Sequence, residues 1–353
     1  MQIDSQKPVL VTGATGYVAG WVVKRLLEKG LTVRATVRDP SNEGRLAYLR
    51  ALAEGTKGTI EFFGADLLEK GSFDEAMQGC GVVLHIASPY IASVKDPQRE
   101  LIDPALNGTR NVLEAVNRTE SVTRVVLTSS CAAIFGSSAD LANTPNGVFN
   151  EEVWNTTSSL TDGAYSYSKT LAEREAWKIH DAQSRWRLVV VNPPGVFGPG
   201  IRMHENAESF RILTSFVDGT FASGVPDIRI GFVDVRDVAE AHLRAAFLPN
   251  ASGRNIISGH NSGFVELAGL VKREFPAIRV SDRKLPKWLL WLVGPILNSA
   301  LTRRFISRNV GHPWRADNRK SIEELGMTYR PLDETFRDHI EQLMKSGSIK
   351  AAA

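Results

Sequence analysis

The sequence predicts an α/β protein, with a doubly wound parallel sheet joined to a smaller, discontinuous C-terminal lobe. Three observations support this prediction. A short apolar run, PVLVT, leads into a glycine-rich turn and then into an amphipathic stretch at residues 18–27. Strand-like and helical patterns alternate from there to residue 192, where a loop rich in proline and glycine, NPPGVFGPG, breaks the alternation. Strands separated by helices indicate a parallel sheet covered on both faces, because parallel neighbours need crossover connections.

Each element of the main domain is predicted from the spacing of its apolar residues. Residues 8–12 form the first strand, and Gly30 stands where the helix that follows would end. Residues 31–37 alternate apolar residues with threonine and arginine, which is typical of a strand. The further strand-like runs are 59–63, 82–85, 124–128 and 188–191, and the helical patterns between them are 45–54, 73–78, 104–117 and 165–181.

The pattern of the C-terminal half predicts that the chain leaves the sheet to form a lobe and later returns to the main domain. A helical pattern at 208–216 follows the proline-rich loop, whereas FVDVRDVAEAHLRAAF and NIISG indicate a return to the main domain. We expect residues 1–192 and about 232–258 to form the main domain, about 193–231 and 259–345 to form the lobe, and 346–353 to fray. Residues 285–301, LPKWLLWLVGPILNSAL, are the most apolar stretch. Their two prolines, lysine and short length predict a buried or pocket-covering helix pair rather than a membrane span.

Composition and charge argue against several classes of protein. Lysine and arginine number 42 against 39 acidic residues, and the formal charge of +3 is too balanced for a nucleic-acid or membrane surface. Cys80 and Cys131 are the only cysteines and neither has a C-x-x-C partner, so we expect no disulfide framework, no structural zinc and a reducing compartment. The seven histidines are scattered, so no metal site is expected, and His85 is predicted to be a packed strand residue. The N-terminus, MQIDSQKP, lacks a basic region followed by an apolar core, which predicts a cytoplasmic protein without a signal peptide.

The glycine-rich turn predicts a Rossmann-type dinucleotide site. Gly13 would let the chain turn tightly after the first strand, and Gly16 would let the backbone approach a pyrophosphate at the N-terminus of the next helix. Ala19 holds the third position of the fingerprint, where a small residue still allows close helix packing. The predicted contacts on this turn are Gly13, Thr15, Gly16, Tyr17 and Val18.

Arg38, at the end of the second strand, favours NADP(H) over NAD(H). An NAD-specific fold would often place an acidic residue there to accept from the ribose hydroxyls. An arginine can instead pair with the 2′-phosphate of NADP through charge-assisted hydrogen bonds, and Arg45 could assist. Asp39 is the next residue, so a shift of the strand end would restore an acid, and NAD(H) is not excluded.

A tyrosine and a lysine share one face of a predicted helix. In AYSYSKTLAEREAW, Tyr165 and Lys169 are four residues apart, about one helical turn, whereas Tyr167 points away from that face. A cation near a phenol lowers the phenol pKa from about 10, and such a tyrosine can exchange a proton with a substrate oxygen. The strand RVVLTSS ends in two hydroxyls, so Ser129 or Ser130 would lie where nicotinamide and substrate meet.

In their order and spacing, TGATGYVAG, the TSS strand end, YSYSK and VNPPGVFGPG resemble the extended short-chain dehydrogenase/reductase family. The resemblance covers nearly the whole chain, from about residue 8 to about residue 343. Within the family, VRATVRDP, VLHIASPY, SKTLAEREAW and FVDVRDVAEAHLRA look like the branch of dihydroflavonol reductases, cinnamoyl-CoA reductases and microbial methylglyoxal or ketone reductases.

This resemblance implies roles for individual residues. Ser130 matches the catalytic serine that hydrogen-bonds the substrate carbonyl, Tyr165 the proton donor, and Lys169 the lysine that binds the nicotinamide ribose and lowers the tyrosine pKa. Asn107 matches an asparagine linked to that lysine through water, although helix packing explains it equally well. The other implied cofactor contacts are Asp66 and Leu67 at the adenine, Ala87 and Ser88 along the ribose and phosphates, and Pro193, Gly195 and Val196 beside the nicotinamide. Tyr90, Phe135 and Tyr165 are the implied substrate contacts.

Phe135 also departs from two related patterns. Flavonoid reductases often carry an asparagine a few residues past the serine, and nucleotide-sugar epimerases often carry a tyrosine in S-S-x-x-V-Y-G. With phenylalanine at this position, both a flavonoid substrate and an epimerase are disfavoured. Trp288 and Trp291 are expected to lie in the core, with a place in the substrate pocket as the alternative.

We therefore expect an NADPH-dependent reductase that converts a medium-sized, partly apolar or aromatic ketone or aldehyde to the alcohol. It would act as a monomer or homodimer, with no nucleic-acid partner and no membrane span. One alternative on the same fold retains NAD to epimerise or dehydrate a nucleotide sugar. The other is a non-catalytic dinucleotide sensor that binds a protein partner, which the pair of Tyr165 and Lys169 disfavours.

Overall fold

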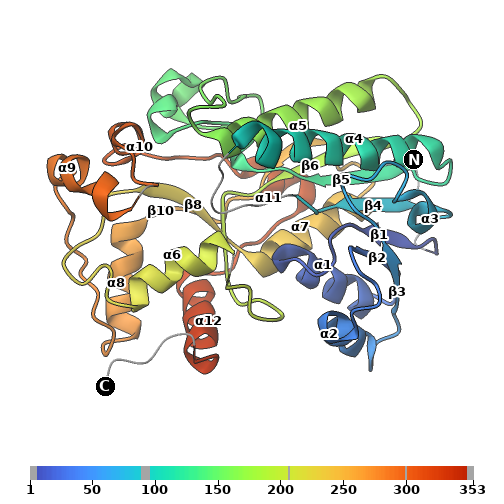
Figure 1. Ribbon diagram of the computed structural model, residues 1–353, viewed down its shortest axis with the longest axis horizontal. Helices are drawn as coiled ribbons and strands as arrows, with labels where there is room; N and C mark the ends of the chain where they lie inside the picture. The colour runs from blue at the N-terminus through green and yellow to red at the C-terminus, as the bar shows by residue number, and fades with distance from the viewer. Residues whose placement is uncertain (1–5, 89–95, 206, 299, 348–353) are drawn as a thin grey trace.

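Seven parallel strands form the main sheet of this protein. The computed structural model describes residues 6–88, 96–205, 207–298 and 300–347, and Figure 1 shows their arrangement. The strand order is β3-β2-β1-β4-β5-β6-β9. The bounds are β1 (Val9–Val11), β2 (Thr32–Val37), β3 (Thr59–Gly64), β4 (Val82–His85), β5 (Arg124–Thr128), β6 (Arg187–Asn192) and β9 (Gly253–Ile256). The order reverses between β1 and β4, which is where doubly wound sheets bind ligands at the carboxyl ends of their strands.

Helices cover both faces of this sheet. One layer holds α1 (Tyr17–Glu28), α2 (Glu43–Ala53) and α7 (Val235–Phe247), and the other holds α3 (Asp74–Met77), α4 (Asp103–Arg118) and α5 (Ala164–Asp181). In Figure 1, α4 and α5 run side by side above the sheet, and α1 and α7 lie below it. Successive strand residues point to opposite faces, so Val9 and Val11 pack with α1 while Leu10 packs with α4. The predicted α/β fold is confirmed.

A second, smaller sheet with the order β10-β8-β7 lies beyond β6. Its strands are β7 (Gly195–Phe197), β8 (Arg229–Asp234) and β10 (His260–Gly263), and it is accompanied by α6 (Glu208–Val217), α8 (Phe264–Glu274), α9 (Lys287–Leu297), α10 (Arg303–Asn309), α11 (Arg319–Leu325) and α12 (Leu332–Lys345). Phe197, Phe210, Phe232 and Phe336 are buried together in its core. Strand β8 pairs within the small sheet, yet α7, which follows it directly, packs on the main sheet. The predicted division of the chain between the two parts stays a prediction.

Helix α1 is tied to the loop that enters the second part. The Tyr17 hydroxyl donates to the carbonyl oxygen of Gly198 at 2.5 Å, and the Trp21 indole N–H donates to that of Pro199 at 2.7 Å. Both acceptors belong to the proline- and glycine-rich loop after β7. The helix that follows the glycine-rich turn therefore also fixes the start of the second part.

Short turns complete the path to α5 and α4. Three 3-10 turns, Cys131–Ala133, Ser138–Asn143 and Pro145–Gly147, separate β5 from α5, and a π-helical turn, Gln98–Ile102, precedes α4. None of the helices in the described ranges is long and apolar enough to cross a membrane. The fraying predicted for residues 346–353 falls almost wholly outside the described residues.

The apolar stretch at residues 285–301 is not buried as predicted. It begins a helix pair, α9 and α10, but Trp288 is 66% exposed and Ile296 is 84% exposed. Within α9 only Leu290 and Gly294 are buried. Hydropathy predicts that a segment prefers burial, but it does not supply the neighbour that would cover it, and here the rest of the fold covers one narrow side.

Candidate active site

The glycine-rich turn has the geometry of a phosphate cradle. Gly13 has φ +63°, and a Cβ there would lie 2.9 Å from the Cβ of Ala87, so both conformation and space require glycine. Gly16 is the N-cap of α1 and supplies no side-chain cap to the helix. The first backbone N–H groups of α1 thus remain available to an anion. These features fit the pyrophosphate of a dinucleotide.

A buried threonine links this turn to the end of β4. The Thr12 hydroxyl oxygen accepts the backbone N–H groups of Ile86, at 3.0 Å, and Ala87, at 2.9 Å, and also bonds Nδ1 of His85. His85 is buried, as predicted, and burial together with the Lys169 charge lowers its pKa to about 3, so the imidazole is neutral. Ala87 is thereby held against Gly13.

At the end of β2 the two candidate residues behave differently. Arg38 is exposed directly after the strand. The Asp39 carboxylate accepts the backbone N–H of Ser41 at 3.0 Å and its hydroxyl at 2.6 Å, and these bonds lower the pKa of Asp39. Arg45 is also exposed, in the first turn of α2. The Asp39 carboxylate is thus engaged in a local turn, whereas Arg38 is exposed to solvent.

The adenine-side candidates lie in the loop after β3. Asp66 accepts the backbone N–H of Leu68 at 2.8 Å, and the Leu67 carbonyl accepts the Asn111 amide at 2.7 Å. Gly108 on α4 allows the close approach of Leu67, because a Cβ at Gly108 would lie 3.1 Å from that side chain. Asn107 is exposed on α4, so the structure supports neither of the roles suggested for it.

Lys169 is buried on α5 and faces the end of β4. Its ammonium donates to the Ser88 hydroxyl at 2.7 Å and lies 5.8 Å from the centre of the Tyr165 ring, so the two residues share a helix face as predicted. Burial lowers the pKa of Lys169 to about 8, and the nearby Glu173 carboxylate opposes that shift. A small cavity beside Lys169 is also lined by Leu67, Ala87 and Ser88. The structure thus brings four of the predicted cofactor contacts together.

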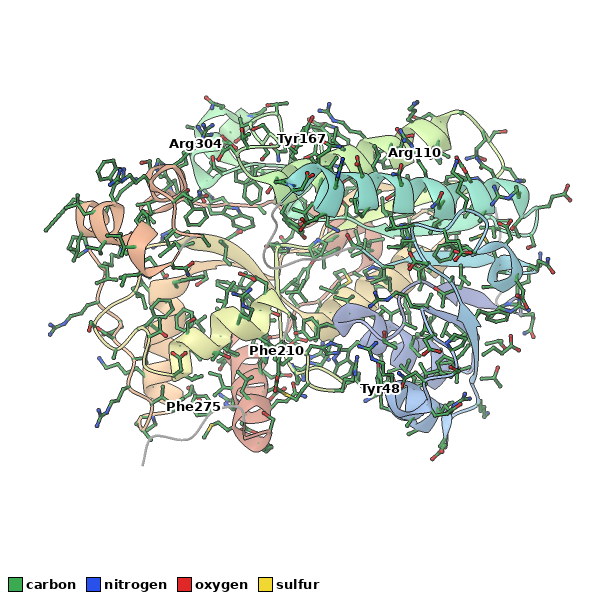
Figure 2. All side chains as sticks on the ribbon, viewed as in Figure 1. Tyr48, Arg110, Tyr167, Phe210, Phe275 and Arg304 are labelled. Carbon is green, nitrogen blue, oxygen red and sulfur yellow. The ribbon has the colours of Figure 1, made fainter. Side chains whose placement is uncertain are left out.

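The pKa of Tyr165 differs from the expectation. The residue is 39% exposed, yet burial by its surroundings raises the pKa of Tyr165 above 10, and the hydrogen bond with Ser130 opposes the rise. The expectation that Lys169 lowers this pKa is therefore wrong for the structure as described. The reason is geometric, because the Lys169 ammonium is engaged with Ser88 rather than with the phenol. Tyr167 is labelled in Figure 2. It is half-buried and directly precedes Ser168 and Lys169, which are both buried.

The two serines at the end of β5 take different places. The Ser129 hydroxyl is buried and donates to the Glu173 carboxylate at 2.5 Å. Ser130 caps the 3-10 turn that follows it, since its hydroxyl oxygen accepts the Ala132 N–H at 3.1 Å. It also bonds Tyr165. Of the two serines left open by the spacing, Ser130 is the one beside the tyrosine.

The loop after β6 borders Ser130. The Pro193 carbonyl accepts the Cys131 N–H at 2.9 Å and the Ser130 hydroxyl at 3.4 Å. Gly195 and Val196 then begin β7, which pairs with β8 in the small sheet. The predicted nicotinamide-side residues are thereby placed at the junction of the two sheets.

Comparison with known proteins agrees with this geometry. Residues 9–257 match the model of the NAD dependent epimerase/dehydratase family. The chain belongs to this family. It is 36% identical to a cinnamoyl-CoA reductase of Medicago truncatula over 95% of both chains, and 34% identical to tetraketide alpha-pyrone reductase 1 of Arabidopsis thaliana over 97% of this chain and 96% of that one.

A solved structure of a family relative is similar throughout. The yeast methylglyoxal/isovaleraldehyde reductase Gre2, complexed with NADPH, superposes with a TM-score of 0.77 at 28% identity, covering 97% of this chain and 99% of that one. These relatives are reductases, so the predicted reductase is confirmed over the nucleotide-sugar epimerase. The NADPH in the yeast complex agrees with the predicted cofactor.

A buried ionic network lies next to the candidate catalytic residues, and no local pattern in the sequence indicates it. The Glu173 carboxylate accepts from Arg254 Nε at 2.6 Å, from the Asn192 amide at 2.9 Å and from Ser129. The Glu173 side chain is fully buried and that of Arg254 is 7% exposed. This network joins α5 and β9 to the ends of β5 and β6. Glu173 is four residues after Lys169, about one helical turn along α5.

Arg202 is a further residue that no motif in the sequence indicated. It lies in the loop after β7, and its guanidinium donates to the Thr15 carbonyl in the glycine-rich turn at 3.3 Å. The guanidinium also stacks 5.1 Å above the ring of Tyr48 on α2, which Figure 2 labels. A cation from the second part of the chain thus stands beside the predicted phosphate cradle.

The predicted substrate contacts have different outcomes. Phe135 is half-buried, and it stacks on the buried Phe149 at 4.6 Å and meets the edge of the buried Trp314 at 5.7 Å. Tyr90 lies outside the described residues. The placement of Trp288 and Trp291 in the core is wrong, because both are exposed.

Within the described ranges no group of histidine, cysteine and acidic residues could hold a metal ion.

Proposed function

We propose that this chain uses NADPH to reduce a ketone or aldehyde to an alcohol, with Ser130, Tyr165 and Lys169 as its catalytic residues. The observation that carries the proposal is that Lys169 on α5 bonds Ser88 after β4, while Tyr165 on α5 bonds Ser130 after β5. The cofactor would lie on Gly13, Thr15, Gly16, Tyr17 and Val18, with Arg38 at its 2′-phosphate, Asp66 and Leu67 at the adenine, Ala87, Ser88 and Lys169 at the riboses, and Pro193, Gly195 and Val196 at the nicotinamide.

The residues of this chain perform the proton side of the reaction. Bound NADPH supplies a hydride to the carbonyl carbon. The hydroxyls of Ser130 and Tyr165 hydrogen-bond the carbonyl oxygen, which stabilises the charge that develops there. Tyr165 then gives this oxygen its proton, and Lys169 keeps a positive charge near the phenolate that results. The raised pKa of Tyr165 keeps the phenol protonated before the reaction, as a proton donor requires.

Arg202 supports the same cofactor site from the second part of the chain. We propose that its guanidinium pairs with a phosphate of the dinucleotide, because it already lies against Thr15 in the turn that would hold that phosphate. Cofactor binding would then also fix the loop after β7. An Arg202→Met variant would bind NADPH more weakly, by about tenfold for one charge-assisted bond.

The proposed substrate is a medium-sized carbonyl compound that is partly apolar or aromatic. Support comes from the half-buried ring of Phe135, and from relatives named for cinnamoyl-CoA, tetraketide alpha-pyrones and isovaleraldehyde. Action in the cytoplasm and a monomeric or homodimeric state stay predictions.

A carbonyl panel tests the proposal. Aliphatic and aromatic aldehydes and ketones are incubated with the protein and NADPH or NADH, and the loss of reduced-nicotinamide absorbance is followed. We expect turnover with NADPH, and a loss of about 10²- to 10⁴-fold in the Tyr165→Phe variant, which should still bind NADPH. Near-normal turnover in Tyr165→Phe would refute the assignment of the proton donor.

A further inference from the structure

Helix α9 carries its apolar side chains on the outside of the molecule. Ten large apolar side chains are exposed in the described residues, and six of them lie on α9 and α10, namely Trp288, Trp291, Leu292, Ile296, Leu297 and Phe305. The first four follow the i, i+3, i+4, i+8 spacing of one helix face. Figure 1 shows α9 and α10 at the far left edge of the second part. A patch this apolar on the surface indicates a contact with another apolar surface.

The segment around this patch is strongly basic. Residues 283–316 contain seven lysine and arginine residues and no aspartate or glutamate. The Arg303 guanidinium lies 4.5 Å above the ring of Trp291, and the Lys287 ammonium donates to the Ser307 carbonyl. Both side chains therefore lie within the patch. Three of the seven pair with aspartates outside the segment, namely Lys284, Arg304 and Arg308. The charge within the patch therefore comes from Arg303 and Lys287.

Two ion pairs fix the helix pair to the rest of the protein. Arg304 pairs with Asp162 at 2.7 Å, and Arg308 pairs with Asp140 at 2.5 Å. Figure 2 shows Arg304 between α10 and the segment that precedes α5. Because Asp162 is three residues before Tyr165, the apolar face is held in a defined orientation close to the start of α5.

We propose that the outer face of α9 and α10 docks on an anionic lipid surface. Tryptophan and branched apolar side chains beside lysine and arginine are typical of helices that lie in the membrane interface. Helix α9 has eleven residues and contains Pro295, so it is too short to span a membrane. It would therefore lie in the plane of the interface. Arg303 and Lys287 would reach the anionic headgroups while the indole rings enter the acyl boundary.

The same charges disfavour a second copy of the chain as the occupant. A two-fold contact presents the same patch from both subunits, so two surfaces that carry Arg303 and Lys287 and have no aspartate or glutamate in residues 283–316 would meet. Like charges placed together in a desolvated interface oppose association. Anionic headgroups instead complement them.

Vesicle sedimentation of the full chain tests the proposal. The protein is mixed with vesicles of phosphatidylcholine alone or of phosphatidylcholine with phosphatidylglycerol, and bound protein and tryptophan emission are measured. We expect binding to the anionic vesicles with a blue shift of the emission. A Trp288→Ser/Ile296→Ser variant should bind more than about a hundredfold more weakly, and Lys287→Gln/Arg303→Gln about thirtyfold more weakly. Ile322→Ser, which changes an exposed apolar residue on α11, is the matched control and should bind as wild type does.

Three outcomes would overturn the proposal. One is that the wild-type chain does not bind anionic vesicles. Another is that Trp288→Ser/Ile296→Ser binds them as well as wild type does. The third is that the wild type sediments as a dimer without vesicles while this variant is a monomer, which would make the patch a contact between copies of the chain. Carbonyl reduction of a water-soluble substrate should be unchanged in the variant, which separates loss of docking from loss of folding.

Discussion

Removing the negative charge of Glu173 should destabilise the protein and also change its pH dependence. In Glu173→Gln the shape is kept, but the Arg254 guanidinium, whose side chain is only 7% exposed, loses its partner at 2.6 Å. The new amide also turns one acceptor into a donor that faces the donors of Asn192 and Ser129. Removing one member of a buried ion pair typically costs about 3–5 kcal/mol, so we expect a loss of that size in the free energy of unfolding.

The second effect acts through Lys169. Burial lowers the pKa of Lys169 to about 8, and Glu173 works against that shift. Without Glu173 the pKa falls further, so the lysine loses its proton at a lower pH. Because reduction uses the protonated lysine beside Tyr165, the alkaline limb of the profile of kcat/KM for reduction should move to lower pH.

Urea unfolding and pH–rate profiles measure the two effects separately. Glu173→Gln/Arg254→Met should recover part of the stability, because no unpaired charge remains, but it should keep a changed pH profile. Glu175→Gln is the control on the same helix, since Glu175 pairs with the more exposed Arg110 and such pairs contribute about 0–1 kcal/mol. If Glu173→Gln unfolds at the same urea concentration as wild type and keeps its pH profile, the role assigned to the network is refuted.

Three further predictions concern the cofactor site. Gly13→Ala should weaken NADPH binding in a fluorescence titration and cost about 1–3 kcal/mol of stability, because its φ is +63° and a Cβ would meet Ala87; Gly269→Ala, with open space around it, should cost nothing. Arg38→Glu should raise KM for NADPH by about tenfold or more relative to NADH, and an unchanged ratio would show that Arg38 does not read the 2′-phosphate. The wild-type reduction rate should fall as pH rises through about 8, where Lys169 loses its proton, and a rate that rises there would contradict the role of the ammonium.

Local patterns were sufficient to predict the main sheet and the places of the candidate catalytic residues. The apolar runs predicted the strands from β1 to β6 within one or two residues, because the central strands are buried on both faces and the edge strand β3 alternates between exposed and half-buried residues over most of its length. The four-residue spacing of Tyr165 and Lys169 placed both on one helix face, and motif order placed Ser130 at the end of β5. These features depend on residues that are close in the chain.

Features that depend on distant residues were missed or misjudged. Glu173 and Arg254 are 81 residues apart, and nothing near either one indicates the other. The direction of the Tyr165 pKa was misjudged because the spacing does not show that Lys169 bonds Ser88, which lies 81 residues earlier. The exposure of Trp288 was missed for a related reason, since burial requires a covering neighbour and that neighbour is set by the tertiary fold.

The anchors between α1 and the loop after β7 have a consequence for the evolution of specificity. Tyr17 and Trp21 bond the carbonyl oxygens of Gly198 and Pro199, which belong to the main chain. Main-chain acceptors persist when side chains are replaced, so the residues that follow in this loop can diverge without loosening it from the cofactor domain. Selection can thus alter what the enzyme recognises while the attachment that positions the second part stays in place.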